Sequence, residues 1–172
     1  MAGSSRAGGP GDLRVIFVCW GNICRSPIAE RVAERKADEA GLTGVRFTSA
    51  GTSSEELGEP MDQRAAAVLR RHGYRSEDHV AHQITADELA QADLVIAMED
   101  IHVGKLHRLD PDAEPIFLLS DFDPDAMPGS GLPDPWYGPD SAFTATLTAV
   151  EAAMPGVLQR VRELQETAAA AS

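Results

Sequence analysis

The sequence of 172 residues has only two cysteines, Cys19 and Cys24, and both lie in one short stretch. Two neighbouring cysteines are too few for the disulfide framework of a small secreted protein. Neither has the spacing to His79 or His82 that a zinc site requires. We therefore expect no metal and no other cofactor, and the low cysteine content favours a reducing, cytoplasmic setting.

Basic residues are also few, with 15 Lys and Arg against 27 Asp and Glu, which gives a formal net charge of −12. This balance argues against nucleic acid or an anionic membrane as a partner. No apolar run approaches the length of a membrane span. Residues 1–12 are rich in Gly, Ala and Ser and lack the apolar centre of a secretory signal, so we interpret them as a flexible tail.

The remaining length and composition predict one globular domain over residues 13–167, followed by a frayed end at 168–172. Short apolar runs alternate with segments of helical periodicity along this domain. The predicted strands are residues 13–18, 45–49, 93–98 and 115–119, and the predicted helices are residues 27–40, 61–72, 86–91, 99–109, 142–154 and 157–165. This alternation predicts an α/β fold, a four-stranded parallel sheet with helices on both faces.

The most informative stretch joins the first strand to the first helix. Gly21 and Asn22, which tolerate positive φ, lie in the turn, and Pro27 suits the first turn of a helix. Backbone amides and the helix dipole converge in such a loop and favour an anion. Arg25 adds a planar donor that matches a phosphate, and the same positive field stabilises a thiolate at Cys19. The pattern therefore predicts covalent phosphoryl transfer at a loop that follows strand one.

A second candidate region is the long acidic segment of residues 120–138, which is rich in Pro and Gly. Segments of this length without regular structure are usually functional or disordered. Four carboxylates could serve there as a general acid, and the residues alone do not distinguish them: Asp121, Asp123, Asp125 and Asp134.

Both regions resemble known motifs. The run Cys19-Trp-Gly-Asn-Ile-Cys-Arg-Ser-Pro27 resembles the signature loop of the low-molecular-weight protein tyrosine phosphatases, of the bacterial type, and Asp134-Pro-Trp-Tyr-Gly138 resembles their acid loop. The similarity extends over about residues 13–165, with further similar segments at residues 49–52, 62–65 and 72–74. It implies hydrolysis of phosphotyrosine, and of small aryl phosphates, through a cysteinyl-phosphate intermediate without a metal.

The resemblance also assigns roles. It implies that Cys19 is the nucleophile, that Arg25 holds the phosphate and that Asp134 is the general acid. Ser49 would support the loop through a hydrogen bond. The residues implied in binding phosphate or substrate are Trp20, Gly21, Asn22, Ile23, Cys24, Ser26, Trp136 and Tyr137. The implied partners are tyrosine-phosphorylated proteins, with inorganic phosphate or vanadate as competing ligands, and we expect a monomer.

Cys24 has two interpretations. It is either a small buried packing residue or a redox partner that traps oxidised Cys19 as a disulfide before further oxidation. The substrate slot also departs from the family pattern, because Glu55 or Glu56 falls where an aromatic wall is usual. Trp20 is a candidate for the missing wall.

Three other functions are compatible with parts of the pattern. A protein-arginine phosphatase usually has Thr where Ile23 stands. An arsenate reductase needs further cysteines after Cys24, and the chain has none. A phosphopeptide-binding module without activity would need no acid at Asp134.

Overall fold

The computed structural model describes residues 11–171. Most of the predicted tail therefore lies outside the described residues, and the division at residue 13 stays a prediction. The elements follow along the chain as β1 (Leu13–Cys19), α1 (Arg25–Glu39), β2 (Val45–Gly51), α2 (Gln63–Arg71), α3 (Ala86–Gln91), β3 (Leu94–Ala97), α4 (Asp100–Leu109), β4 (Ile116–Leu118), the 3-10 helix η1 (Leu119–Phe122) and α5 (Asp140–Ala171).

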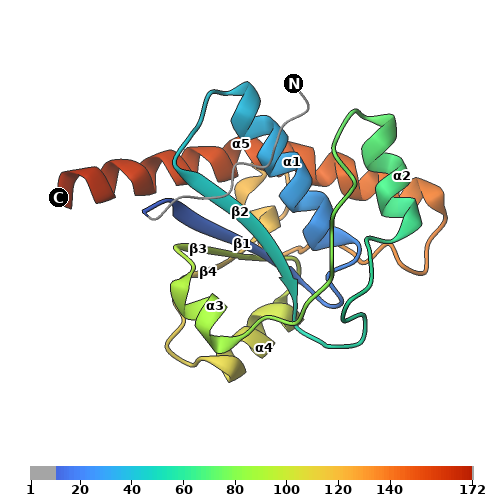
Figure 1. Ribbon diagram of the computed structural model, residues 1–172, viewed down its shortest axis with the longest axis horizontal. Helices are drawn as coiled ribbons and strands as arrows, with labels where there is room; N and C mark the ends of the chain where they lie inside the picture. Colours follow the sequence, from blue (N-terminus) through green and yellow to red (C-terminus); the bar gives the residue numbers. More distant parts are fainter. Residues whose placement is uncertain (1–10, 172) are drawn as a thin grey trace.

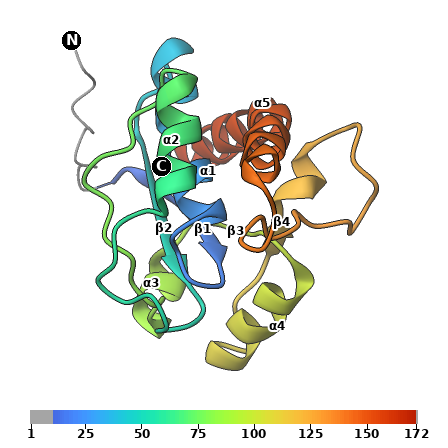
Figure 2. The same ribbon diagram turned by 90° about the vertical axis from the view of Figure 1, so that its right-hand side faces the viewer.

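The four strands form one sheet in the order β2-β1-β3-β4, and every neighbouring pair is parallel. Helices α1, α2 and α5 cover one face of this sheet, and α3 and α4 cover the other (Figures 1 and 2). The predicted α/β architecture is confirmed. Because β1 is central, its carboxyl end lies between the carboxyl ends of β2 and β3, which is where ligands bind in sheets of this kind.

Strand β1 is buried on both faces, as its continuous apolar run predicts. Val15, Phe17 and Cys19 contribute to the core beneath α1 and α5, and Ile16 and Val18 to the core beneath α3 and α4. This alternation follows from the two-residue period of a strand. It directs the side chain of Cys19 toward the α1 side, where the strand ends.

Helix α5 is longer than the predicted segments. The sequence predicts helix over residues 142–154 and 157–165, and one helix runs from Asp140 to Ala171 with Pro155 inside it. An internal proline removes one hydrogen bond, yet buried residues continue on both sides of it, including Met154 and Val157. Burial of this face offsets the lost bond, and the terminal alanines have the highest helix propensity.

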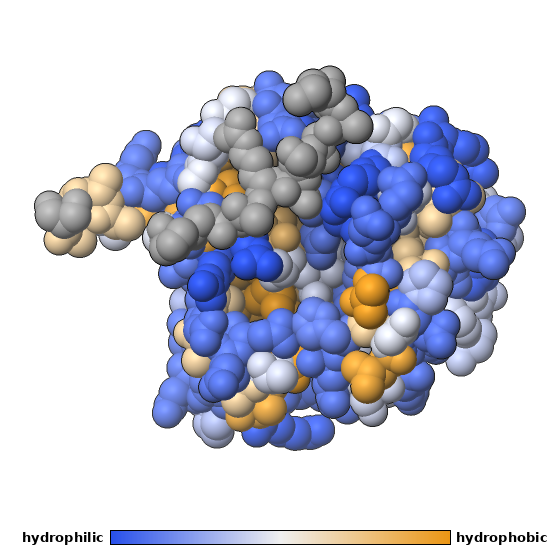
Figure 3. Space-filling view, in the orientation of Figure 1, coloured by the Kyte–Doolittle hydropathy of each residue, from blue (hydrophilic) through white to orange (hydrophobic). Residues whose placement is uncertain are grey.

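The viewed surface is mostly hydrophilic, with small separate apolar areas (Figure 3). Over the described part of the chain, every helix is too short or too polar to cross a lipid bilayer.

Candidate active site

The β1–α1 loop, residues 19–25, is held open by hydrogen bonds to its carbonyl groups. The carbonyl of Cys19 accepts from the Thr52 amide at 2.9 Å, and that of Trp20 accepts from the Ser53 amide at 3.0 Å. Farther along, the Ile23 carbonyl accepts from the Asp62 amide at 2.9 Å. In a trans peptide the N–H points opposite to the C=O. Since the carbonyls point outward, the amides that follow them point into the loop, which is a cradle for an oxyanion.

Asn22 sets the turn of this loop. Its φ is 61° and its side chain is fully buried. Non-glycine residues rarely adopt this left-handed conformation unless local hydrogen bonds stabilise it. Here Nδ2 donates to Ser26 Oγ at 2.9 Å and to Ser49 Oγ at 3.0 Å, while Oδ1 accepts from the His82 amide at 3.1 Å. Ser49, which was expected to support the loop, therefore contacts it through Asn22.

Cys19 lies at the floor of the cradle. Its side chain is buried, and Sγ lies 3.0 Å from Ser26 Oγ. Helix α1 begins at Arg25, so the positive end of its dipole faces the sulfur. The sulfur therefore lies beside a hydroxyl group that can donate to it and beside the N-terminus of a helix.

Arg25 is buried and is oriented by distant parts of the chain. Its Nη1 donates to Glu99 Oε1 and to the Leu132 carbonyl, the latter at 2.8 Å. Its Nη2 lies 3.6 Å from Asp134 Oδ2. Glu99 and Leu132 fix the plane of the guanidinium, so the fork of donors is oriented before any anion binds.

Asp134 is the one acidic candidate of the 120–138 segment that pairs with Arg25 in the described residues. Its Oδ1 accepts from the Trp136 amide at 3.0 Å. The carboxylates of Asp121 and Asp123 instead accept from the amides of Leu118 and Asp125, both at 2.9 Å, and so stabilise turns. Position relative to Arg25 thus favours Asp134 over Asp121 and Asp123 as the candidate acid.

Aromatic side chains lie beside this site. The indole of Trp20 donates to Glu55 Oε2 at 3.1 Å, and the Lys105 ammonium lies 4.5 Å from the ring centroid. The ring of Trp136 lies beside Arg64, which donates to its carbonyl at 3.0 Å. Tyr137 is 94% exposed. Trp20 and Trp136 are therefore held in place by polar neighbours, whereas Tyr137 faces solvent.

Cys24 is the residue that precedes α1, without a side-chain hydrogen bond to the helix, and its side chain is buried. Burial raises the pKa of the Cys24 thiol, and the negative charge of Asp62 raises it further. Both cysteines are free thiols. The two cysteines thus differ, because the surroundings of Cys24 disfavour its thiolate.

Sequence reasoning missed several residues around the loop. Glu99 orients Arg25, and its position just after β3 is a signal that could have found it, because that strand ends beside β1. His79, to which we assigned no site, lies with Nε2 2.6 Å from the Asn22 carbonyl. Glu30 accepts from Ser49 at 2.7 Å. In the described residues, no cluster of three or more His, Cys, Asp or Glu side chains has the arrangement of a metal site.

Gly51 allows β2 to approach the loop. A Cβ at this position would lie 2.7 Å from the Trp20 carbonyl oxygen and 3.2 Å from the Asn22 amide nitrogen. We expect Gly51→Ala to displace the loop backbone, to lower the free energy of unfolding by about 1–3 kcal/mol and to reduce turnover. Urea unfolding and steady-state kinetics measure both effects. Gly104→Ala is the matched control, because a Cβ there meets no atom within 4 Å, and equal behaviour of the two variants would contradict the prediction.

His102 makes stability depend on pH. It is buried, and its Nδ1 accepts from the Glu99 amide at 3.1 Å. Burial, followed by the charges of Arg25 and Lys105, lowers the pKa of His102 from 6.5 to about 4. As the pH falls, the unfolded chain therefore binds the proton first, and the native state loses stability between pH 6.5 and about pH 4.

We expect this histidine to remove up to about 3 kcal/mol from the free energy of unfolding across that range. Urea unfolding at a series of pH values measures the loss. His102→Asn keeps an acceptor for the Glu99 amide but does not titrate, so its stability should fall less steeply. Parallel curves for the two proteins would show that His102 is not responsible.

Comparison with known proteins agrees with this geometry. Residues 14–167 match the family model for low molecular weight phosphotyrosine protein phosphatase. A low molecular weight protein-tyrosine-phosphatase of Streptomyces coelicolor is 45% identical over 163 residues, which cover 91% of this chain and 98% of that protein.

Solved structures agree as well. A protein tyrosine phosphatase from Entamoeba histolytica, with Hepes in its active site, superposes with a TM-score of 0.83 at 29% identity, covering 90% of this chain and 99% of that one. Wzb of Vibrio vulnificus in complex with benzylphosphonate superposes with a TM-score of 0.76 at 27% identity, covering 87% and 99%. The chain belongs to the low molecular weight phosphotyrosine protein phosphatase family.

Proposed function

We propose that this protein tyrosine phosphatase hydrolyses phosphotyrosine in proteins with Cys19 as nucleophile, Arg25 as phosphate ligand and Asp134 as general acid. The observation that carries the proposal is the convergence of these residues on one loop. Sγ of Cys19 lies 3.0 Å from Ser26 Oγ, and Arg25 Nη2 lies 3.6 Å from Asp134 Oδ2.

In the first step the Cys19 thiolate attacks phosphorus and forms the S–P bond. The P–O bond to the phenol breaks, and its electron pair goes to the phenolic oxygen, which takes a proton from Asp134. Arg25 and the inward amides of the loop stabilise the charge on the three equatorial oxygens. Two displacements replace one difficult displacement, which is the benefit of covalent catalysis.

In the second step water attacks the cysteinyl phosphate. The Asp134 carboxylate takes a proton from this water, the new O–P bond forms, and the S–P bond breaks with its electrons returning to sulfur. The Ser26 hydroxyl donates to the sulfur as the thiolate leaves. Inorganic phosphate is the product, and the enzyme returns to its starting protonation state.

The proton on Asp134 depends on the substrate. Arg25 lies between this carboxyl group and the place of the phosphate, so both anions compete for one guanidinium. A bound phosphate dianion disfavours a neighbouring carboxylate, which promotes the protonated acid that the first step requires.

The substrate ring would lie between Trp20, whose indole donates to Glu55, and Trp136, whose ring lies beside the Arg64 guanidinium. An aromatic slot above a deep cradle favours an aryl phosphate over the shorter phosphoserine. The benzylphosphonate bound to Wzb of Vibrio vulnificus is an aryl ligand with a tetrahedral phosphorus group, and this supports the proposal.

We further propose that phosphate and vanadate compete for the site. We also propose that the enzyme acts as a monomer and that it works in the cytoplasm, without nucleic-acid or membrane partners.

Cys24 extends the proposal to oxidation. Peroxide would convert the Cys19 thiolate to a sulfenic acid, and the Cys24 thiol would displace water from it to form a disulfide. Mass spectrometry of the peptide that contains both cysteines tests this step. A loss of two hydrogens is expected after peroxide treatment, and recovery of only sulfinic or sulfonic acid at Cys19 would exclude the trap.

The activity is tested by assaying p-nitrophenyl phosphate with and without vanadate, followed by phosphotyrosine and phosphoarginine peptides. We expect vanadate-sensitive turnover and a preference for phosphotyrosine. Preference for phosphoarginine would favour the alternative substrate class, and binding without turnover would favour a phosphopeptide-binding module.

A further inference from the structure

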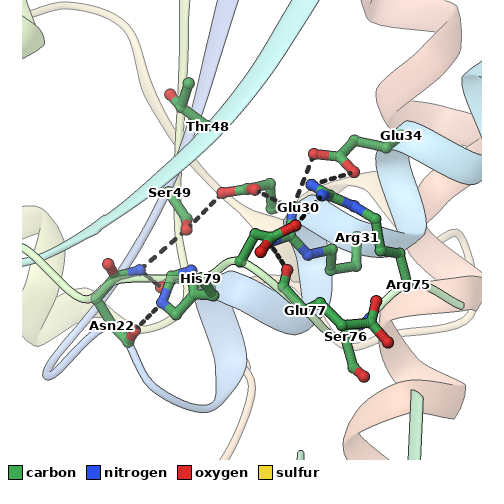
Figure 4. A network of polar contacts seen from close by, with 12 residues as sticks. Asn22, Glu30, Arg31, Glu34, Thr48, Ser49, Arg75, Ser76, Glu77 and His79 are labelled. Atoms are coloured by element: carbon green, nitrogen blue, oxygen red, sulfur yellow. Dashed lines mark hydrogen bonds and ion pairs between the residues drawn. The ribbon is translucent and has the colours of Figure 1, made fainter. Parts of the chain in front are cut away.

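Arg31 is a buried charged residue that the proposed mechanism does not use. It lies on α1 beyond the β1–α1 loop, and 3% of its surface is exposed. Its Nη1 donates to Glu30 Oε2 at 2.8 Å and to Glu34 Oε1 at 3.1 Å, and its Nη2 donates to the Glu77 carbonyl at 2.9 Å (Figure 4). Burying a guanidinium is unfavourable unless its partners are well placed, and two chains of contacts lead from these partners to the loop.

The first chain starts at Glu30. Its Oε1 accepts the Ser49 hydroxyl at 2.7 Å, and Ser49 Oγ in turn accepts from Asn22 Nδ2 at 3.0 Å. Asn22 Nδ2 also donates to Ser26 Oγ at 2.9 Å, and Ser26 Oγ lies 3.0 Å from Cys19 Sγ. Figure 4 shows the part of this chain from Glu30 through Ser49 to Asn22.

The Glu30 carboxylate sets the direction of the first hydrogen bond in this chain. A carboxylate only accepts, so the Ser49 hydroxyl donates to it and offers a lone pair to Asn22. Asn22 Nδ2 donates to Ser26 Oγ as well, so a lone pair of Ser26 is engaged, and its proton has two acceptors within reach, Cys19 Sγ at 3.0 Å and the Ala50 carbonyl at 3.5 Å, of which the sulfur is the nearer. Arg31 holds the Glu30 carboxylate at 2.8 Å and so fixes the acceptor at the far end of this chain.

The second chain reaches Asn22 from the other side. Arg31 holds the Glu77 carbonyl, and two residues later the buried His79 has Nε2 2.6 Å from the Asn22 carbonyl. A carbonyl only accepts, so Nε2 carries the proton. Burial lowers the pKa of His79, the hydrogen bond to the Asn22 carbonyl opposes this change, and the charge of Arg31 adds to the lowering. His79 is therefore a neutral donor whose segment is anchored by Arg31.

The other described charged groups around Arg31 do not make the same pair of contacts. Arg75 Nη2 lies 3.6 Å from Glu34 Oε2 but is not paired with Glu30, and its Nη1 lies 3.6 Å from Asp78. His82 pairs with Glu88 at 2.7 Å. Among the described residues, Arg31 is the one cation that contacts both the Glu30 carboxylate and the segment that carries His79.

We propose that Arg31 is a positioning residue for the nucleophile, which holds Asn22 from both sides and directs the Ser26 proton to Cys19. The inference rests on the proposed function, because it assumes that Cys19 reacts as a thiolate. Without Arg31, the Glu30 and Glu34 carboxylates would repel each other one helical turn apart. This repulsion would move the Glu30 carboxylate, and Ser49 would then lose its fixed acceptor.

Arg31→Met tests this by removing the charge while keeping the length of the side chain. Alkylation of Cys19 by iodoacetate is followed against pH, with the labelled residue identified by mass spectrometry. We expect the midpoint of alkylation to rise by about one pH unit, equivalent to about tenfold less thiolate at pH values below the midpoint. For p-nitrophenyl phosphate we expect kcat to fall more than KM rises, because the loop amides that bind phosphate stay in place.

Arg31→Lys should return the midpoint toward that of the wild type, since an ammonium also neutralises the two carboxylates. Arg35→Met is the matched control, because Arg35 lies one turn along α1 and its exposed side chain pairs with Glu39. It should leave the midpoint and kcat unchanged. A thermal melt of each variant reports whether it is folded.

A folded Arg31→Met protein with the midpoint and kcat of the wild type would overturn the inference. So would a fall in kcat without a shift in the midpoint, because that result indicates a merely structural role. Should Arg31→Met fail to fold, Glu30→Gln decides instead: the midpoint is expected to rise, and an unchanged midpoint overturns the proposal. Absence of turnover by the wild type would count against the proposed function. An active wild type, together with an Arg31→Met variant that has the same midpoint and kcat, would count against this inference alone.

Discussion

Replacing Cys19 with serine is expected to abolish turnover of p-nitrophenyl phosphate while phosphate still binds. A serine hydroxyl is not ionised where a cysteine thiol can be, so the nucleophile is lost and we expect a decrease of at least about 10⁴-fold in kcat. The cradle itself does not depend on sulfur, because amides from outside the loop, such as those of Thr52, Ser53 and Asp62, hold its carbonyls.

Three measurements check this result. Steady-state kinetics gives the loss of turnover, calorimetric titration with inorganic phosphate gives the remaining affinity, and rapid quenching of the wild type during turnover should trap a phosphorylated Cys19 peptide. Turnover by Cys19→Ser comparable with that of the wild type would end the covalent mechanism. Loss of phosphate binding together with a lower melting temperature would instead show that the sulfur is needed for the loop to fold.

Replacing Asp134 with alanine should reduce kcat by roughly 10²–10⁴-fold for poor leaving groups, the usual contribution of general acid–base catalysis. The loss should be smaller for phenols that leave readily, because these need no proton in the first step. The position of the carboxyl group beside Arg25 carries this expectation. A plot of log kcat/KM, which reports the first step, against the acidity of the leaving phenol should therefore become steeper in the variant.

Asp125→Ala provides the control, because Asp125 belongs to the same acidic segment and is exposed to solvent. It should leave the series of aryl phosphates unchanged. An equal loss of kcat/KM for every leaving group in Asp134→Ala would contradict its role as acid, because kcat/KM reports the first step, and a loss in Asp125→Ala would reopen the choice among the acidic residues of that segment.

The local sequence was sufficient to predict the β1–α1 loop. An apolar run ends at Cys19, Asn22 accepts the left-handed turn, and Pro27 lies in the first turn of α1. Each of these features depends on neighbours within a few residues. A different connection at this point would leave the apolar strand exposed to solvent. The alternation of strands and helices likewise predicted the parallel sheet.

Local patterns were insufficient where packing outweighs propensity. The predicted helical segments leave out residues 155 and 156, yet α5 continues through Pro155 because the apolar face on both sides is buried. The acidic segment offers four equivalent carboxylates, and only the folded chain brings Asp134 to Arg25. Propensity and periodicity contain no information about which distant groups meet.

The sequence by itself thus indicated the loop, together with the proposed nucleophile and the proposed phosphate ligand, because these lie within one short stretch of chain. The tertiary structure decided what holds that loop. Glu99 and Leu132 reach Arg25 from 74 and 107 residues away, and His79 reaches Asn22 from 57. Their positions follow from the strand order β2-β1-β3-β4, which brings the ends of β2 and β3 to either side of β1. That order is set by the burial of both faces of the sheet, a property of the whole domain and not of any segment.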